Sequence, residues 1–209
     1  MRTNYNLYEY EDSLHKEGYK YIGGTDEAGR GPLFGPVVAA CCILPNDFKL
    51  EGLTDSKQLT EKKREKYFDY ITENALAYGI GIVDHKEIDR INIYAASKKA
   101  MMIAIEEASK KIKPDYVLTD AMPLELDIPV LPIIKGDAKS ISIAAASVLA
   151  KVTRDRMMYE IDKKYPEYGF ANHKGYPTKK HIEAIHKYGL IDGYRLTYGP
   201  VKEIVNNTI

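Results

Sequence analysis

The sequence predicts an α/β fold built on a mixed sheet of five strands, with an antiparallel half and a parallel half. One observation is the order of elements, which reads as three strands, a helix, two strands and a further helix. Another is the continuous apolar, β-branched run over residues 37–44, which is typical of a buried strand. The final third of the chain reads mainly as helices and predicts a C-terminal helical appendage.

The first half of the chain is expected to supply three neighbouring strands. Residues 21–26 and 37–44 predict two antiparallel strands, joined by a rigid loop rich in glycine and proline over 29–36. Residues 76–83 predict the third strand. In the second half, short strands are expected over 116–119, ending at Asp120, and over 130–134.

Helices are expected between and after these strands. Thr54 or Asp55 could cap a helix that ends near Glu73, because their side chains can accept hydrogen bonds from first-turn amides. A long helix is expected over 84–112, and the small residues over 140–159 predict a helix packed closely on the sheet. We interpret residues 1–209 as a single domain, with the sheet core over about 1–160 and a helical segment over about 161–209.

The composition predicts a cytoplasmic protein, which we expect to be a monomer. Of the 209 residues, 44% are hydrophobic and 29% are charged, as in soluble proteins. The apolar run over 37–44 is far shorter than the roughly 18 residues that cross a bilayer, so no membrane partner is expected. The N-terminus is polar and acidic, unlike a targeting signal. Cys41 and Cys42 are neighbours, which argues against a disulfide framework.

The charge balance limits how the chain could bind nucleic acid. The 30 lysines and arginines equal the 30 aspartates and glutamates, so there is no bulk positive field. A polyanion would have to meet a local patch. Basic residues cluster over 57–66, 135–139 and 174–180, although for any one cluster taken alone a solvated helix face is the favoured interpretation.

Four carboxylates follow predicted strands. Asp26 and Glu27 end the first strand and lead into glycines, Asp120 closes the strand over 116–119, and Asp137 follows another strand. Strand ends that converge at a topological switch point usually form the active-site crevice of such a sheet. A polar turn after the first strand is the alternative for Asp26 and Glu27, which in a regular strand would point to opposite faces.

Four carboxylates close together cannot all stay ionised without cations. Oxygen ligands favour Mg²⁺ or Mn²⁺, and no cysteine or histidine spacing suggests zinc. Two such ions roughly 4 Å apart could support phosphodiester hydrolysis. His173 lies in a glycine-containing loop, where a solvated histidine is the simpler reading.

Several sequence blocks resemble, in order, those of the ribonuclease HII family. They are Thr-Asp-Glu-Ala-Gly-Arg-Gly-Pro at 25–32, Asp-Ser-Lys with Leu59 at 55–59, the segment from Gly-Asp-Ala-Lys-Ser to Ala-Ser at 136–147, Ala-Lys-Val at 150–152 and His-Lys-Gly-Tyr at 173–176. They cover the chain from about residue 20 to residue 190. Type HIII enzymes carry an extra N-terminal domain, and only 25 residues precede Asp26, so type HII is the better match.

The resemblance implies a ribonuclease H-like fold and a metal-dependent endonuclease. Its implied substrates are RNA–DNA hybrids and DNA duplexes with embedded ribonucleotides, cut on the 5′ side of the ribonucleotide to leave a 3′-hydroxyl and a 5′-phosphate. It also implies that two Mg²⁺ or Mn²⁺ ions are held by Asp26, Glu27, Asp120 and Asp137, which would be the catalytic residues.

The resemblance assigns substrate contacts as well. The main chain of Gly29, Arg30 and Gly31 would meet the ribonucleotide 2′-hydroxyl, the group that separates RNA from DNA, and Tyr176 would pack on the following sugar. Phosphates on either side would be held by Ser56, Lys57, Lys139, Ser142, Ser147, His173 and Lys174. Packing of a helix on the sheet is the alternative role for Ser142 and Ser147, and Lys151 is expected to serve the fold by reaching acidic groups.

The chain departs from the family pattern in two places. Pro177 follows Tyr176 where many members have glycine, and Leu196 stands where the family usually has a second arginine after Arg195. Two other functions remain open at the level of sequence: a nucleic-acid binding module that has lost its chemistry, and a small-molecule metallophosphatase.

Overall fold

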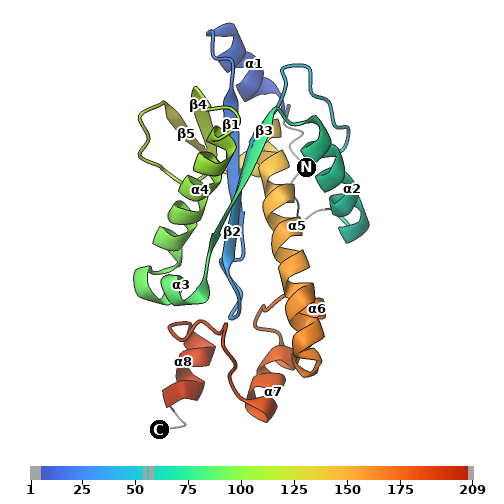
Figure 1. Cartoon of the computed structure of the whole chain (residues 1–209), viewed down its shortest axis with the longest axis vertical. Coiled ribbons are helices and arrows are strands. Elements are labelled where there is room, and N and C mark those ends of the chain that lie inside the picture. Colours follow the sequence, from blue (N-terminus) through green and yellow to red (C-terminus); the bar gives the residue numbers. More distant parts are fainter. Residues whose placement is uncertain (1–5, 54–55, 57–58, 207–209) are drawn as a thin grey trace.

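A computed structural model describes residues 6–53, 56 and 59–206. In this part of the chain, five strands form one mixed sheet in the order β3-β2-β1-β4-β5, which confirms the predicted fold class (Figure 1). β1 pairs antiparallel with β2, and β2 with β3, whereas β1, β4 and β5 run parallel. The strands are β1 (Ile22–Ala28), β2 (Val37–Ile43), β3 (Ala77–Val83), β4 (Tyr116–Asp120) and β5 (Val130–Ile133).

Helices cover both faces of the sheet and both of its ends. They are α1 (Glu9–Lys16), α2 (Glu61–Asn74), α3 (His85–Ile91), α4 (Ile93–Ser109), α5 (Ile141–Lys164), α6 (Phe170–His173), α7 (Lys179–Tyr188) and α8 (Gly199–Asn206), with 3-10 turns η2 (Gly136–Ala138) and η3 (Pro166–Tyr168). α4 lies on one face, and α5 with α2 on the other (Figure 1). None of the described helices is long and apolar enough to cross a membrane.

The inner strand β2, which lies between β3 and β1, explains why the apolar run is continuous. Its side chains alternate between two cores, so that Ala39 and Cys41 pack among α4 residues while Ala40 and Cys42 pack among α5 and α2 residues. All seven residues of the strand are buried. A strand covered on both faces has no position for a polar side chain.

Two predicted helices have different bounds in the structure, because capping side chains start a helix at other residues than expected. The helix expected over 84–112 is broken at Asn92, whose φ is 70° and whose side chain accepts a hydrogen bond from the Ala95 amide to start α4. α2 begins at Glu61, capped by Thr60 rather than by Thr54 or Asp55. Thr54 and Asp55 lie outside the described residues.

Two boundaries also differ from prediction. β1 does not stop at Asp26 but continues through Ala28, because the antiparallel pairing with β2 extends to Ala28 and Val38. α5 runs to Lys164 instead of residue 159, so the expected boundary near residue 160 falls inside a continuous helix.

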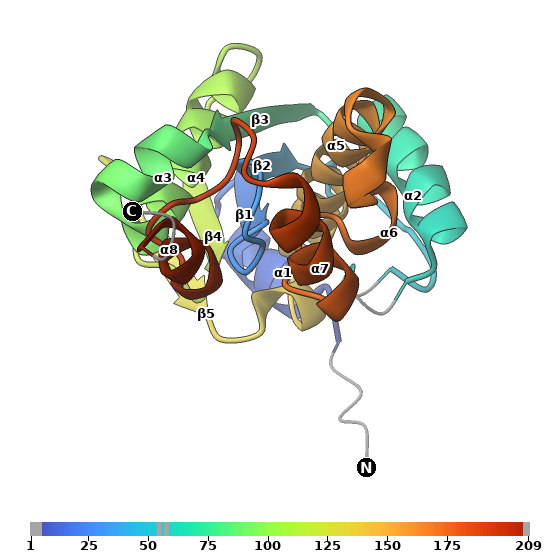
Figure 2. The same ribbon diagram turned by 90° about the horizontal axis from the view of Figure 1, so that it is seen from below.

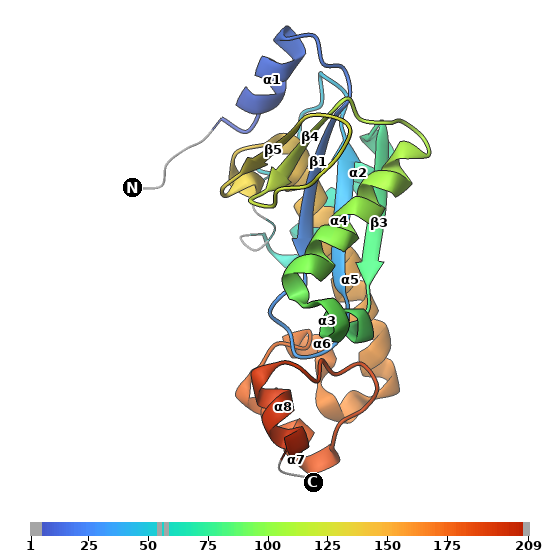
Figure 3. The same ribbon diagram turned by 90° about the vertical axis from the view of Figure 1, so that its left-hand side faces the viewer.

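The C-terminal segment packs under one end of the sheet, opposite α1 (Figure 3). Seen from below, α7 and α8 lie on the two sides of β1 and β2 (Figure 2). Their core includes Phe34 from the β1–β2 loop, whose ring lies 4.3 Å from that of Phe170 and 4.9 Å from that of Tyr194. The loop between the first two strands is therefore held by the last third of the chain.

Candidate active site

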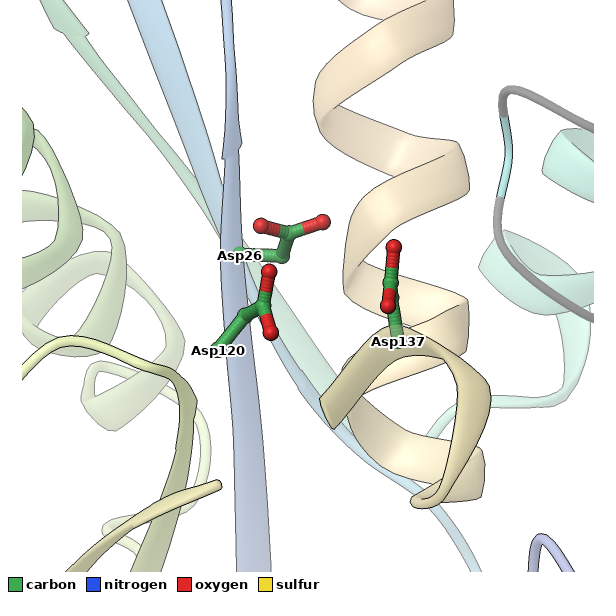
Figure 4. A group of neighbouring side chains, drawn as sticks. All are labelled: Asp26, Asp120 and Asp137. Carbon is green, nitrogen blue, oxygen red and sulfur yellow. The ribbon is translucent and has the colours of Figure 1, made fainter. Parts of the chain in front are cut away.

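Three aspartates meet at one place in the sheet. Oxygen atoms of Asp26, Asp120 and Asp137 lie within 4.8 Å of one another, and the three side chains point toward a common centre (Figure 4). Asp26 and Asp120 are brought together by the parallel pairing of β1 with β4, because each follows directly on the paired residues Thr25 and Thr119. Asp120 ends β4, as the sequence predicts, whereas Asp26 lies inside β1, which continues to Ala28.

Asp137 reaches this centre from η2, the turn after β5. An Asp120 carboxylate oxygen accepts a hydrogen bond of 2.7 Å from the Gly136 amide, which ties the end of β4 to that turn. The turn leads into α5, whose N-cap Ser140 donates a 2.5 Å hydrogen bond to Glu11 of α1. Two buried hydrogen-bonded links thus fix Asp137 on both sides.

Asp26 is held in an environment that disfavours its charge. Burial, followed by repulsion from Glu27 and Asp120, raises the pKa of its carboxyl well above the usual 3.8, against a hydrogen bond from Ser147 that lowers it. Ser147 is in turn 2.8 Å from the Ser56 hydroxyl. The Ser147 hydroxyl thus links Asp26 to Ser56 at the wall of the site.

Glu27 lies beside the cluster without joining it. Its side chain lines the same pocket, but among the described residues the carboxylate oxygens that lie within 4.8 Å of one another are those of the three aspartates. One Glu27 carboxylate oxygen is 3.3 Å from the Arg30 guanidinium. Successive side chains of a strand point to opposite faces of the sheet, which explains why the Glu27 carboxylate lies apart from that of Asp26.

The carboxylates line a polar pocket of about 270 Å³. Asp26, Glu27 and Asp120 supply its negative wall. The other lining residues are Ala28, Gly29, Arg30, Gly31, Ser56, Ser147, Lys151, Arg154 and Tyr176. The pocket thus combines acidic residues with a glycine loop, hydroxyls, cations and one aromatic ring.

The donor set fits a hard divalent cation. All the candidate ligand atoms are carboxylate oxygens, which Mg²⁺ and Mn²⁺ prefer. Burial, and then repulsion from Glu27 and Asp120, raises the pKa of the Asp26 carboxyl, and a cation at the centre would favour its ionised form against both effects. The residues present therefore fit such an ion.

Tyr176 stands across the glycine loop from the carboxylates. Its ring is 41% exposed and lies so near Gly31 that a Cβ there would be 3.3 Å from it. The Tyr176 carbonyl accepts a 2.8 Å hydrogen bond from Nδ1 of His181, and Nε2 of that ring accepts one from the Tyr194 hydroxyl. Burial lowers the pKa of His181 to about 4, which keeps the ring neutral and these bonds intact.

The ring of His173 bonds the backbone on both of its nitrogen atoms. Its Nδ1 accepts a hydrogen bond from the Gly175 amide, and its Nε2 bonds the Tyr168 carbonyl. Both ring nitrogens are therefore used to shape the loop that carries Tyr176. Desolvation lowers the pKa of His173, which is consistent with a neutral ring.

Ser142 is turned away from the pocket. It is 1% exposed, and its amide and hydroxyl both donate to Glu11. This placement favours the packing role over a phosphate contact. Ser56 and Ser147 do line the pocket.

The expected lysine contacts fall in different places. Lys139 lines a separate pocket beside α1, and the Lys174 ammonium lies 3.9 Å above the Tyr159 ring and bonds the Ala171 carbonyl. Lys57 lies outside the described residues. Neither Lys139 nor Lys174 is among the described residues that line the carboxylate pocket.

The sequence did not predict that three further residues line the pocket or hold the loops around it. Lys151, expected to serve the fold, does bond Asp155 at 2.6 Å but also lines the pocket. Arg154 is buried and donates to the carbonyls of Phe34, Pro36 and Lys174. His181 had no sequence signal beyond its helix, since its partners are residues 176 and 194.

Comparison with known proteins places this arrangement in context. The family model described as ribonuclease HII matches residues 23–198. A ribonuclease HII of Bacillus cytotoxicus is 54% identical over 201 residues, 96% of this chain and 77% of that protein. One of Listeria innocua is 57% identical over 194 residues, 93% of this chain and 74% of that protein. The crystal structure of ribonuclease H2 from Pyrococcus horikoshii is 30% identical, with a TM-score of 0.75 over 90% of this chain and 98% of that one.

Proposed function

Because the chain belongs to the ribonuclease HII family, we propose that it recognises single ribonucleotides in duplex DNA and cuts on their 5′ side. The broader activity follows from the family: the chain is an endoribonuclease that hydrolyses the RNA strand of RNA–DNA hybrids, and it requires a divalent metal ion. The products of the proposed junction cleavage are a 3′-hydroxyl and a 5′-phosphate.

We assign metal binding to Asp26, Asp120 and Asp137, with Glu27 completing the set from the adjacent position on β1. The convergence of three of these carboxylates supports the assignment. Two bound Mg²⁺ or Mn²⁺ ions would activate water and stabilise the leaving oxygen. Asp26 is oriented by the Ser147 hydroxyl, while Asp120 is oriented by the Gly136 amide.

One observation carries the proposal for ribonucleotide recognition. Gly29, Arg30, Gly31 and Tyr176 line the same pocket as Asp26, Glu27 and Asp120. Backbone amides can bond a 2′-hydroxyl, and a flat ring on the next sugar leaves no room for a second one. Ser56, Ser147 and Lys151 line the same pocket and are the residues proposed to contact the phosphates.

The direct test is cleavage of a DNA duplex that carries one ribonucleotide, with and without Mg²⁺, with the cut mapped to the nucleotide. We expect a metal-dependent cut on the 5′ side of the ribonucleotide. Cleavage of continuous hybrids alone would contradict the junction proposal and leave the family activity intact. Release of inorganic phosphate from small esters, without either cut, would favour the metallophosphatase alternative.

Changing Tyr176 to alanine should reduce cleavage of a single embedded ribonucleotide far more than cleavage of a continuous hybrid. The expected difference is about 1–3 kcal/mol, the worth of one aromatic stack. Tyr176→Phe should keep most of the preference, because the ring provides the contact. Single-turnover rates on both substrates measure the effect.

Tyr94→Ala is the matched control, since that tyrosine is 47% exposed on α4, away from the pocket residues. Its two rates should equal those of the unchanged protein. Equal losses on both substrates for Tyr176→Ala would make Tyr176 a general support of its loop.

A further inference from the structure

Arg195 lies beneath the glycine loop, fully buried. Its guanidinium donates to the Gly35 carbonyl at 2.9 Å, the Arg30 carbonyl at 3.0 Å and the Gly29 carbonyl at 2.6 Å. It also donates to the Tyr198 hydroxyl, which itself donates to the Arg30 carbonyl at 2.7 Å. One planar side chain thus contacts three carbonyls of the loop.

This arrangement fixes the direction of two peptide planes. In a trans peptide the C=O and the following N–H point in opposite directions. Since the Gly29 and Arg30 carbonyls point inward to Arg195, the amides of Arg30 and Gly31 point outward. Arg30 and Gly31 are exposed and line the carboxylate pocket, so the outward side is the pocket side. Among the described residues, neither amide donates a backbone hydrogen bond to the protein.

Stability alone does not account for such a residue. Desolvation lowers the pKa of Arg195, as expected for a cation taken out of water. Its four hydrogen bonds all end on uncharged oxygen atoms. Burying a charge costs several kcal/mol, and apolar residues of similar volume often stabilise a fold as well or better. A rigid fork of donors is suited instead to setting orientation.

We infer that Arg195, assisted by Tyr198, is a positioning residue that aims the Arg30 and Gly31 amides at the ribonucleotide 2′-hydroxyl. The inference deepens the proposed function and rests on it. Arg195 touches no substrate in this arrangement. It acts through the loop. The segment 194–198, in which Leu196 follows the arginine, therefore contributes to ribonucleotide recognition by holding the loop from beneath and not by contacting phosphate.

The test measures binding, so that it does not depend on cleavage. Two duplexes differ only in one sugar, ribose or deoxyribose, and their dissociation constants are measured with Ca²⁺ in place of Mg²⁺. Arg195→Lys keeps the charge but replaces three guanidinium nitrogens in a rigid plane with one rotatable ammonium, which cannot hold the three carbonyls in the same geometry. It should lower the preference for the ribose duplex by about ten-fold, with unchanged affinity for the all-DNA duplex.

Tyr198→Phe removes one donor to the Arg30 carbonyl and should lower the preference by about three-fold. If Arg195→Lys does not fold, this milder variant tests the positioning role in its place. Arg90→Lys is the control, because Arg90 forms a surface ion pair with Glu87 on α3. It should match the unchanged protein in both dissociation constants.

The outcomes separate the two proposals. If the unchanged protein does not prefer the ribose duplex, ribonucleotide recognition fails, and this inference fails with it. If it does, and a folded Arg195→Lys or Tyr198→Phe variant keeps the full preference, the positioning role is wrong and the proposed function stands. An equal loss of affinity for both duplexes would also overturn it, since that pattern indicates a general role in the fold or in phosphate binding.

Discussion

Changing Asp26 to asparagine should lower the cleavage rate by several orders of magnitude while the metal-free protein melts at the same temperature or higher. The first effect follows from the loss of a charged metal ligand, since bound ions supply several kcal/mol of transition-state stabilisation. Asparagine keeps the shape of the side chain, and its amide oxygen can still accept the 2.7 Å hydrogen bond from the Glu27 amide. The variant therefore changes charge with little change in packing.

The second effect follows from the raised pKa of Asp26. A carboxyl whose folded pKa lies above its unfolded value destabilises the fold when ionised, so stability falls as pH rises from 3.8 through the folded pKa. At neutral pH the asparagine removes that penalty. Mg²⁺ should raise the melting temperature of the unchanged protein, because it binds the folded state, and raise that of Asp26→Asn much less.

Single-turnover cleavage and thermal melts with and without Mg²⁺ measure both effects. Asp47→Asn is the control, since Asp47 is exposed and remote from the three-aspartate cluster. It should change neither rate nor melting. A wild-type cleavage rate for Asp26→Asn in saturating Mg²⁺ would remove Asp26 from the metal site.

Changing Gly24 to alanine should destabilise the protein by about 3 kcal/mol or more, at the upper end of overpacking effects. A Cβ at this position would lie 2.1 Å from the Ser142 carbonyl carbon and 2.3 Å from the Ile143 nitrogen. These are backbone atoms of α5, so no side-chain rotation can relieve the contact. The helix would have to move away from β1.

Urea-induced unfolding measures the loss. Gly199→Ala is the control, because a Cβ at Gly199 meets nothing within 4 Å. Its stability should stay within about 0.5 kcal/mol of the unchanged protein. A similarly small change for Gly24→Ala would show that α5 can shift on the sheet, contrary to its close packing.

The sheet and the acidic site could be predicted from local signals. The buried run in β2 is visible in the sequence, and so are Asp26 and Asp120 at the ends of predicted strands. The parallel pairing of β1 with β4 then brings the two carboxylates together. The break between α3 and α4 was missed. Asn92 lies within a stretch of helix-favouring residues, and its positive φ and its cap to Ala95 become visible only in three dimensions.

The supports of the site could not be predicted because their partners are distant in sequence. Ser142 donates a hydrogen bond to Glu11, which lies 131 residues away, and the sequence around Ser142 does not predict this partner. His173 was read as a solvent or phosphate residue, since a loop histidine gives no sign that both ring nitrogens bond the backbone. Local patterns indicate where charges gather, whereas the orientation of backbone groups depends on contacts across the fold.

The hydrogen bonds from Arg195 to the β1–β2 loop can form only after most of the chain has been synthesised. Residues 30 and 195 are 165 positions apart. At about 5–20 residues per second, the ribosome makes the second partner roughly 10–30 seconds after the first. β1, β4 and η2, which carry the three aspartates, are all complete before it. The nascent chain therefore contains the three aspartates before it contains the Arg195 guanidinium, and the loop proposed to tell ribose from deoxyribose is completed later than the acidic cluster.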